Sequence, residues 1–428
     1  MKKWKILALV LVLVLAFTAC SNKKKDEPAD TDVTEQDANN GAEDSTKDEG
    51  QNADSADKED ANKEDANKED ANKEEEKKEE VVLGIKDILG EYGLKAGTCL
   101  TNNMLGNANC VRIIKQNFNS ITFENDMKPD YILDKNASVA AGDIVVKFND
   151  NTLKLLKWCK NNEMAVRGHT IIWHSQTPTW IFYEDFDPSK ALVSRDVMLA
   201  RMESYIRQVF EQLEATGYSD MIYAYDVVNE AWLDDGTMRD SLWRTTIGDD
   251  YLWHAFYFAD KYAPEHIELY YNDFNEQFKT EALYNFVQTL KDEEGNYFID
   301  GIGFQAHLYT EDSLDDYFAT VDKLASLGIK VNLTELDVCL GSWPVIKPAS
   351  EKNLKLQGQF YYNLVEGLLK RVKEGTVKMD SLTIWGFVDT LSWRSERNPM
   401  LFNMAYKPKY AYYGVMQMKD QAGFDTEE

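Results

Sequence analysis

Residues 81–428 of this 428-residue chain predict an α/β fold, a (β/α)8 barrel, and three observations carry that prediction. Eight short apolar runs alternate with stretches of helical periodicity, which is the pattern of repeated strand–helix units. The runs are apolar in their first halves, as strands covered on both faces should be. Most of them then end in a polar side chain, and barrels of this kind carry their chemistry at the C-terminal ends of the strands.

The predicted strands follow one another at regular intervals along the chain. They are LKAGTCL (94–100), SITFEN (120–125), AVRGHTIIWH (165–174), AYDVVNE (224–230), ELYYNDFN (268–275), GIGFQAHL (301–308), KVNLTELDV (330–338) and SLTIWGFVD (381–389). Between them, apolar residues recur at helical spacing, as in Met198, Met202, Tyr205, Ile206, Val209 and Leu213, in Leu283, Phe286, Val287 and Leu290, and in Phe360, Leu364, Leu368 and Val372. Gly217 and Gly328 stand where the C-caps of two helices are expected.

The first 20 residues resemble a bacterial lipoprotein signal peptide. Three lysines precede an apolar run over 6–16, which is too short to span a bilayer comfortably. Ala19 then places a small residue before Cys20, which becomes the lipidated first residue in such signals. The alternative is an ordinary secretory signal with a coincidental cysteine. Either signal predicts export; the first also predicts a cell-surface protein anchored to the membrane through Cys20, which cleavage of the following spacer could release.

Residues 21–80 have a different composition, and we expect them to be a disordered spacer rich in Asp, Glu, Lys and Asn. The segment contains no Phe, Trp, Tyr, Leu, Ile or Met, and KEDAN occurs three times in succession over 58–72. Such a chain cannot bury enough apolar surface to offset the entropy of ordering. We interpret it as a solvated tether that holds the folded part away from the membrane or wall, with an acidic binding tail as the alternative.

The net charge favours a neutral substrate. The formal charge of the chain is −27, of which the spacer contributes −13 and the signal +3, so that −17 remains in residues 81–428. A domain this acidic is not expected to bind nucleic acid or another polyanion.

Polar or aromatic side chains stand at the ends of seven of the eight predicted strands. They are Glu124, Asn125, His169, His174, Asn229, Glu230, Asn272, Asp273, Gln305, His307, Glu335, Asp337, Trp385 and Asp389. A charged side chain at the end of a buried strand is costly unless it is paired, solvated or takes part in function. Glu230 alone could be a solvated strand end, but because these strand ends share one rim we expect it to face a common pocket.

Two glutamates, Glu230 on the fourth strand and Glu335 on the seventh, are expected to face each other across that pocket. Facing carboxylates suit the cleavage of a glycosidic bond, in which one carboxyl group protonates the leaving oxygen and an ionised one attacks the anomeric carbon. The gap is about 5–5.5 Å in retaining enzymes and wider in inverting ones. The spacing along the sequence leaves that choice open.

Competing chemistries have weaker signals. No HExxH motif or cluster of ligands at short spacing favours a catalytic metal. No nucleophile elbow holds a Ser or Cys, and no Gly-rich loop before a helix predicts phosphate binding. The remaining cysteines could be buried free thiols or disulfides of an exported protein; they are Cys99, Cys110, Cys159 and Cys339.

Four tryptophans fall at or just beyond strand ends, namely Trp173, Trp180, Trp385 and Trp393. Sugars stack their apolar C–H faces on flat rings while polar neighbours fix the hydroxyl groups. The alternative is that these rings pack the barrel loops.

Residues 84–420 closely resemble the family-10 glycoside hydrolases, the endo-β-1,4-xylanases. The matching stretches, in the order of the family, are FNSITFENDMKPD (118–130), RGHTIIWHSQTPTW (167–180), YDVVNEAWLDDGTMRDSLWRTTIG (225–248), LYYNDFN (269–275), GIGFQAHL (301–308), LTELDV (333–338) and IWGFVDTLSWR (384–394). The resemblance implies a TIM barrel, hydrolysis with retention of configuration, and no cofactor or metal.

The resemblance also implies roles for individual residues. Glu335 would be the nucleophile, Glu230 the acid/base, and Asn229 the partner of the sugar's 2-hydroxyl group, while His307 and Asp337 would orient Glu335. Residues that match those gripping the −1 and −2 xylose units are Glu124, Asn125, Lys128, His169 and Trp173. Gln305, Trp385 and Trp393 also match the glycone side, and Asn272 and Gln176 match residues close to the reaction centre.

Physical reasoning adds three expectations to these roles. The negative charge of Glu335 should raise the pKa of Glu230 and keep it protonated until Glu335 is esterified. His307 and Lys128 should supply donors that keep Glu335 ionised and the sugar positioned. Trp385 should select xylose by crowding the place of the hydroxymethyl group of glucose.

Two positions depart from the family pattern. Phe274 stands where the family often has Tyr, which removes a polar contact on the aglycone side, and Pro129 replaces a common Trp. The expected partners are xylan and xylo-oligosaccharides, and nothing requires more than a monomer. The alternatives are a β-1,4-glucanase or mixed-specificity glycosidase on the same barrel, and a lipoprotein that captures polysaccharide without turnover. The capture protein would have lost one carboxylate, whereas both are present.

Overall fold

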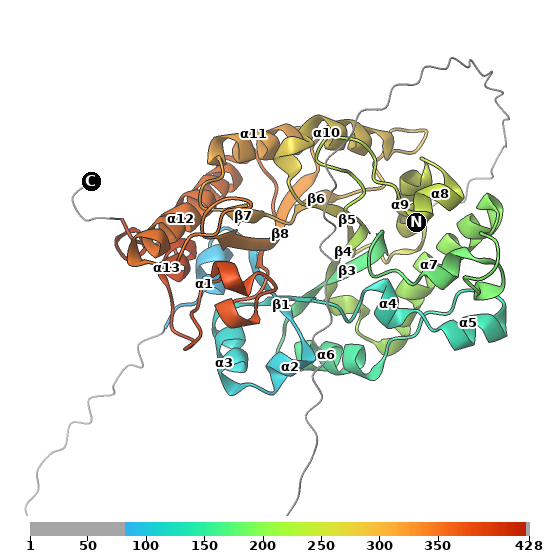
Figure 1. Cartoon of the computed structure of the whole chain (residues 1–428), viewed down its shortest axis with the longest axis horizontal. Coiled ribbons are helices and arrows are strands. Elements are labelled where there is room, and N and C mark those ends of the chain that lie inside the picture. Colours follow the sequence, from blue (N-terminus) through green and yellow to red (C-terminus); the bar gives the residue numbers. More distant parts are fainter. Residues whose placement is uncertain (1–81, 425–428) are drawn as a thin grey trace, which may run out of the picture. The chain divides into compact units, whose positions relative to one another are not determined.

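The computed structural model describes residues 82–424, which contain the predicted barrel. Within these residues nine strands pair in parallel in the order β6-β5-β4-β3-β2-β1-β9-β8-β7, and a further pairing of β6 with β8 closes the sheet. The helices surround the strands (Figure 1). The predicted signal (1–20) and spacer (21–80) lie outside the described residues.

The strands are β1 (Lys95–Leu100), β2 (Ser120–Phe123), β3 (Ala165–Trp173), β4 (Ile222–Asn229), β5 (Glu268–Asp273), β6 (Gly301–Phe304), β7 (His307–Tyr309), β8 (Lys330–Cys339) and β9 (Ser381–Ile384). The α-helices are α1 (Ile85–Gly90), α2 (Asn102–Leu105), α3 (Ala108–Asn117), α4 (Pro129–Ile132), α5 (Lys135–Ala141), α6 (Asp150–Asn161), α7 (Arg195–Thr216), α8 (Leu242–Ile247), α9 (Tyr251–Tyr262), α10 (Thr280–Thr289), α11 (Leu314–Ala325), α12 (Glu351–Glu374) and α13 (Tyr410–Val415).

The eight predicted strands are confirmed, with one break. The run over 301–308 forms β6 and then β7, because Ala306 adopts a left-handed backbone with φ of 59° and ends the first segment. After this turn β7 pairs with the second half of β8, so that His307 lies opposite Asp337. The break therefore brings a predicted site residue into register with its predicted partner.

The three predicted amphipathic stretches lie in α7, α10 and α12. Gly217 caps α7 in a left-handed conformation with φ of 70°, as expected. The prediction for Gly328 is wrong in position, because Ser326 caps α11. Two further turn hydrogen bonds, from the N–H groups of Leu327 and Gly328, follow that cap before β8 begins.

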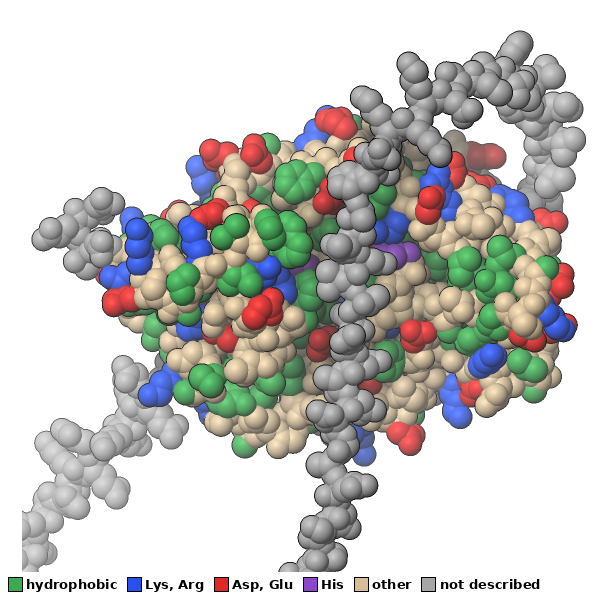
Figure 2. All heavy atoms as spheres, viewed as in Figure 1, with side chains coloured by type: hydrophobic (Ala, Val, Ile, Leu, Met, Phe, Trp, Pro, Cys, Tyr) green, Lys and Arg blue, Asp and Glu red, His purple; other side chains and the backbone are tan. Residues whose placement is uncertain are grey.

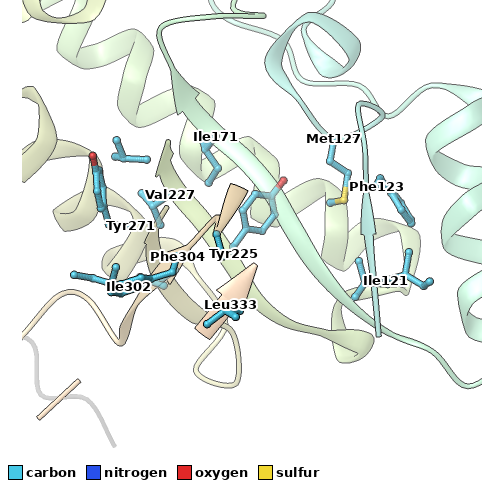
Figure 3. Packing of buried hydrophobic residues seen from close by; sticks show 14 of the residues in the cluster. Ile121, Phe123, Met127, Ile171, Tyr225, Val227, Tyr271, Ile302, Phe304 and Leu333 are labelled. Carbon is cyan, nitrogen blue, oxygen red and sulfur yellow. The ribbon is translucent and has the colours of Figure 1, made fainter. Parts of the chain in front are cut away.

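The core fills the barrel and the layer between strands and helices. Figure 3 shows side chains such as Tyr225, Phe304 and Leu333 packed together, and all three are fully buried. A side chain at Gly168 would place its Cβ 2.3 Å from the ring of Tyr225, so this position has to be glycine for the ring to fit. Each buried large apolar side chain contributes roughly 1.5–3 kcal/mol, and the barrel is thus a rigid support for its rim.

The surface carries charges of both signs. Lys and Arg side chains are interspersed with Asp and Glu over the face seen in Figure 2. Among residues 82–424, no helix is long and apolar enough to cross a membrane.

Candidate active site

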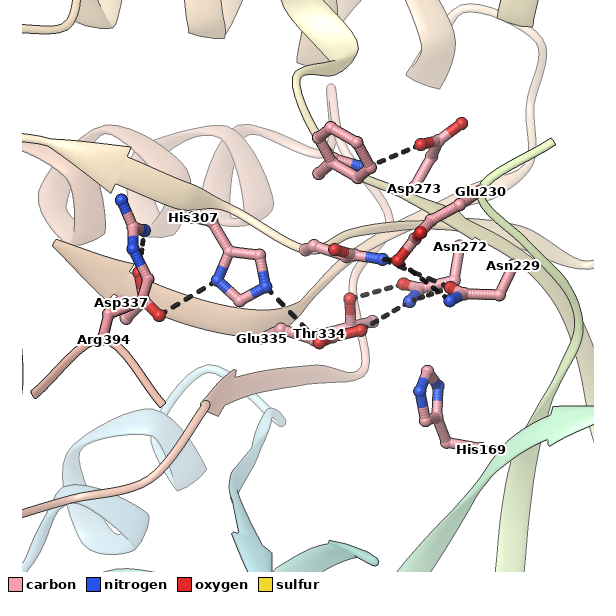
Figure 4. Close-up of polar contacts among 12 residues, drawn as sticks. His169, Asn229, Glu230, Asn272, Asp273, His307, Thr334, Glu335, Asp337 and Arg394 are labelled. Atoms are coloured by element: carbon pink, nitrogen blue, oxygen red, sulfur yellow. Dashed lines mark hydrogen bonds and ion pairs between the residues drawn. The ribbon is translucent and has the colours of Figure 1, made fainter. Parts of the chain in front are cut away.

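Glu335 lies on β8, with 5% of its surface exposed. Its Oε1 accepts a hydrogen bond from Asn272 Nδ2 at 2.7 Å, and its Oε2 lies 3.5 Å from His307 Nε2 (Figure 4). An amide from β5 and an imidazole from β7 thus fix both oxygens of this carboxyl group. A carboxylate held in one orientation beside a positive charge is suited to act as a nucleophile.

His307 connects Glu335 to two further charged side chains, Asp337 and Arg394. Its Nδ1 lies 3.0 Å from Asp337 Oδ2, and the other oxygen of Asp337 accepts a hydrogen bond from Arg394 Nη1 at 2.5 Å. Burial lowers the pKa of His307, but Asp337 and Glu335 outweigh burial and raise it to about 9. His307 is therefore an imidazolium at neutral pH, and both of its N–H groups donate to carboxylates.

Asp337 stays ionised although it is fully buried. Burial raises its pKa, but His307 and Arg394 outweigh burial and lower the pKa overall. Alternating charges from Arg394 through Asp337 to His307 fix the ring of His307 against Glu335. The structure thus brings together the two residues predicted to orient Glu335 and adds Arg394, which the sequence reasoning missed.

Glu230 follows β4 and has a left-handed backbone with φ of 55°. Its carboxylate accepts three N–H donors: Asn229 Nδ2 at 3.1 Å, Gln305 Nε2 at 2.9 Å and Trp173 Nε1 at 3.0 Å. Left-handed backbone at a residue other than glycine stores strain and is enriched at functional sites. These contacts hold the carboxylate in one orientation.

The pKa of Glu230 differs from the expectation. Burial raises this pKa, but the nearby His174 and the hydrogen bonds from Gln305 and Trp173 outweigh burial, so the pKa is lowered overall. The expectation that the charge of Glu335 keeps Glu230 protonated is wrong for this structure. The physical reason is that hydrogen bonds donated to a carboxylate stabilise its ionised form.

A pair of amides joins the two carboxyl groups. Asn272 Nδ2 donates to Asn229 Oδ1 at 2.9 Å as well as to Glu335, and Gln305 Nε2 lies 3.2 Å from the same Asn229 oxygen. The Oδ1 of Asn272 accepts from Thr334 Oγ1 at 2.6 Å, which fixes the orientation of the amide. Figure 4 shows Glu230 and Glu335 grouped around this amide pair.

His169 belongs to a second set of linked charged side chains on the other side of the barrel. Its Nδ1 lies 2.9 Å from Asp226 Oδ2, and Asp226 is paired with the fully buried Arg167. Burial raises the pKa of Asp226, but Arg167 and His169 outweigh burial and lower it. The ring of His169 meets Trp385 edge to face, with centroids 5.6 Å apart. Trp385 is buried.

The predicted glycone-side residues from β2 and β3 form a third group. Lys128 Nζ donates to Asn125 Oδ1 at 3.0 Å and to Gln176 Oε1 at 2.6 Å, and lies 4.8 Å from the centroid of the Trp173 ring. Gln176 Nε2 also donates to Asn125. Glu124 directly follows β2 and is partly exposed. Four of the predicted side chains thus contact one another before any sugar is present.

The four tryptophans divide into two classes. Trp173, Trp385 and Trp393 lie at the rim, and Trp393 is 52% exposed with its ring 5.1 Å from that of His307. Trp180 instead is buried in a 3-10 turn and packs edge to face on Phe186. The alternative that these rings pack loops is therefore correct for Trp180.

The sequence reasoning missed four polar residues of these networks. Asp226, Thr334 and Arg394 each bind a predicted site residue, and Arg167 binds Asp226. A signal existed for two of them, because Arg167 and Asp226 are charged residues inside apolar runs. The four cysteines at 99, 110, 159 and 339 are buried free thiols. Across residues 82–424 no group of three or more His, Cys, Asp or Glu side chains could hold a metal ion.

Comparisons with known proteins agree with this geometry. A bifunctional endo-1,4-beta-xylanase of Ruminococcus flavefaciens is 37% identical over 349 residues, which cover 78% of this chain and 34% of the relative. Endo-1,4-beta-xylanase B of Butyrivibrio fibrisolvens is 32% identical over 336 residues, covering 76% of this chain and 51% of the relative. The chain thus spans about a third and about half of the lengths of these two relatives.

Solved structures give the same result. The CBM22-1 and GH10 modules of the Clostridium thermocellum endo-1,4-beta-D-xylanase 10B, complexed with xylohexaose, superpose with a TM-score of 0.71 at 32% identity, covering 81% of this chain and 69% of that one. The family model that matches this sequence is Glycosyl hydrolase family 10, over residues 84–418. The chain belongs to glycosyl hydrolase family 10.

Proposed function

We propose that this protein is a retaining endo-β-1,4-xylanase in which Glu335 is the nucleophile and Glu230 the acid/base. The observation that carries the proposal is the pair of glutamates joined through Asn229 and Asn272. The imidazolium of His307 lies beside one of them, Glu335. Family membership supports it, as do relatives of which several are named as xylanases.

The reaction has two displacement steps. In the first, a Glu335 oxygen attacks C1 of the xylose in the −1 subsite, the C1–O4 bond breaks, and Glu230 gives its proton to the leaving O4. In the second, Glu230 removes a proton from water, the water oxygen attacks C1, and the bond between C1 and Glu335 breaks. Both carboxyl groups then return to their starting states. No cofactor takes part.

Glu230 must be protonated when the sugar is bound, although its pKa is lowered in the free site. We infer that substrate binding itself supplies the change. Asn229 Nδ2 donates to Glu230 Oε1 in the free site and is also the group expected to meet the 2-hydroxyl of the sugar. When Asn229 Nδ2 donates to the sugar's 2-hydroxyl group instead, Glu230 loses one hydrogen bond that favours its ionised form, and its pKa rises.

The glycone side would be held by the groups built around Lys128 and His169. The Nδ1 of His169 is occupied by Asp226, which leaves Nε2 for a sugar hydroxyl. Asn125, Gln176 and Lys128 are linked by hydrogen bonds, so little entropy is lost when they receive a ligand. Trp173, Trp385 and Trp393 would supply the ring faces, Gln305 a donor near the acid/base, and Glu124 an acceptor at the rim.

The substrate test uses residues 81–428, which contain the whole barrel, and measures the release of reducing ends from soluble xylan and from a soluble β-1,4-glucan. We expect mixed short oligomers from xylan and their absence with Glu335→Ala. Preference for the glucan would keep the barrel and both glutamates but remove the role of Trp385. Binding of xylan without release of ends would indicate a capture protein instead.

We also propose that the protein is exported, processed at Cys20 and held at the cell surface by a lipid, acting as a monomer. The support is the basic and apolar start of the sequence, the small residue before Cys20, and the polar segment after it. The test compares the full chain with Cys20→Ala in the expressing bacterium. Detergent-dependent release of the first and loss of the membrane-bound fraction in the second support the anchor, whereas identical fractionation contradicts it.

A further inference from the structure

The backbone of Glu230 needs external support. A residue other than glycine in the left-handed region is strained and keeps that conformation only where its surroundings fix it. With φ of 55°, Glu230 would relax if its segment were free, and its carboxylate would move with it. The contacts of the neighbouring residues therefore show what holds the acid/base in place.

Two of these contacts come from β5 and one from the loop that follows it. The N–H of Glu230 donates to the carbonyl of Asn272 at 2.9 Å. The N–H of Ala231 donates to the hydroxyl of Tyr271 at 3.0 Å, and the carbonyl of Trp232 accepts from Lys279 Nζ at 2.8 Å. Three successive residues, 230 to 232, are thus held by β5 and the segment that follows it.

Lys279 and Asp273 form the hub of these contacts. Lys279 Nζ donates to Asp273 Oδ1 at 3.0 Å and lies 3.4 Å from Asp234 Oδ1, so its three N–H groups all have partners. The hydroxyl of Tyr271 donates to the other oxygen of Asp273. The side chains of Lys279 and Asp273 are both fully buried.

Asp273 is also linked to the carboxylate of Glu230 through Gln305. The backbone N–H of Gln305 donates to the carbonyl of Asp273 at 2.8 Å and to Glu276 Oε1 at 3.0 Å. The side chain of Gln305 then donates to Glu230 Oε1 at 2.9 Å. The main chain of Asp273 therefore supports Gln305, whose side chain supports the carboxylate of Glu230. Asp273 and Glu230 are both labelled in Figure 4.

We propose that Lys279 and Asp273 are positioning residues for the acid/base: their buried ion pair holds Trp232 directly and Ala231 through Tyr271, so that the adjoining Glu230 is placed for proton transfer. This inference rests on the proposed function, because it assigns a part of that same site. A buried ion pair is weak evidence for stability alone, since desolvation can cost as much as the attraction returns. Burial raises the pKa of Asp273 to about 6 even with Lys279 beside it, in keeping with that cost.

The test uses the dependence of the rate on the leaving group. Xylotetraose has a poor leaving group that needs a proton from Glu230, whereas 2,4-dinitrophenyl β-xylobioside has one that leaves without a proton. Because kcat/KM reports only the first displacement, misplacing the acid lowers kcat/KM for the tetraose alone. General acid catalysis contributes about 10²–10⁴-fold, and a displacement of about 1 Å can cost about 10²-fold.

The variants are Lys279→Met, which removes the ammonium but keeps the length of the side chain, and the double change Lys279→Met with Asp273→Asn, which leaves no unpaired buried charge. For either folded variant of the full chain we expect kcat/KM on xylotetraose to fall by about 100-fold. On the dinitrophenyl substrate we expect a fall of less than about threefold. Glu230→Ala provides the reference for complete loss of the acid.

The matched control is Lys409→Met. Lys409 is buried, pairs with Asp389 at 2.9 Å and donates to the carbonyl of Asn398 at 2.9 Å, and none of these hydrogen bonds reaches residues 230–232. We expect its two kcat/KM values to change by the same factor. Equal losses on both substrates for the Lys279 variants, or no loss on either, would overturn the inference. An inactive wild type, or a Glu230→Ala variant without selectivity, would instead overturn the proposed function.

Discussion

Replacing Asp337 by Asn should discharge His307 at neutral pH. The pKa of His307 is about 9, compared with 6.5 for an unperturbed histidine, and Asp337 is the largest cause that raises it. That shift corresponds to about 3.4 kcal/mol, at about 1.36 kcal/mol per pKa unit. Without Asp337, burial acts to lower the pKa, and we expect titration at about 6.5 or below. At pH 7.5 the ring should change from about 97% charged to about 10% or less.

Stability should respond to pH in a defined direction. A histidine whose pKa is raised by folding contributes stability that is fully present below pH 6.5 and is lost as pH rises through 9. Between these limits the free energy of unfolding of the wild type should fall by up to about 3 kcal/mol relative to Asp337→Asn. Loss of the charge beside Glu335 should also lower kcat/KM on xylan by roughly 10- to 100-fold.

The assay is an NMR titration of the labelled histidine rings, together with denaturant unfolding at pH 6 and pH 9.5. Asp226→Asn is the matched control, because Asp226 holds Nδ1 of His169 in the same way and is paired with its own arginine. It should leave the titration of His307 unchanged. A wild-type His307 that titrates at or below pH 7, or one that titrates identically in Asp337→Asn, would refute the claim that Asp337 keeps His307 charged.

Three further predictions follow from particular side chains. Trp385→Ala should raise activity on β-glucosides relative to β-xylosides by roughly tenfold, because it opens space for a hydroxymethyl group; equal loss on both sugars contradicts this. Glu276→Gln should become more stable than the wild type as pH rises from 4.5 to 8, by roughly 1.4 kcal/mol per pH unit. Burial raises the pKa of the Glu276 carboxyl to about 8, so between these pH values it ionises in the unfolded chain but stays protonated in the folded one, while glutamine stays neutral in both; a pH-independent difference in unfolding contradicts this. Arg167→Met should cost about 3–5 kcal/mol in denaturant unfolding, because it leaves Asp226 buried without its partner, and an unchanged midpoint would show that Asp226 does not need it.

The fold was predictable because its signals are local. Each strand is a short apolar run, most of the runs end in a polar residue, and stretches of helical periodicity lie between them, so the order of elements can be read without knowing any contact. The break at Ala306 could not be predicted in this way. It depends on the pairing of His307 with Asp337, two residues 30 positions apart. The cap of α11 was placed at Gly328 because a glycine after a helix usually marks its end, whereas the helix is capped two residues earlier, at Ser326.

The site was predictable to the extent that its residues stand at strand ends. Glu230, Glu335 and His307 do so, as do their direct partners Asn272 and Asp337, whereas the residues that bind those partners were missed. Thr334 and Arg394 act through partners on other strands or loops, and nothing in the local sequence marks that. The direction of the pKa shift of Glu230 was wrong for the same reason. The donors Trp173 and Gln305 come from β3 and from the break after β6, and only the closed barrel brings them to one carboxylate.

The central claim is that Glu335 forms the covalent intermediate and that Glu230 does not. The most direct measurement treats the wild type with 2,4-dinitrophenyl 2-fluoro-β-xylobioside, whose fluorine slows the second displacement, and locates the label by peptide mass spectrometry. We predict one fluorosugar per chain, attached to the peptide that contains Glu335, and no label in Glu335→Ala. Attachment at Glu230 or elsewhere, or release of dinitrophenolate from an active enzyme that never carries a label, would contradict the account.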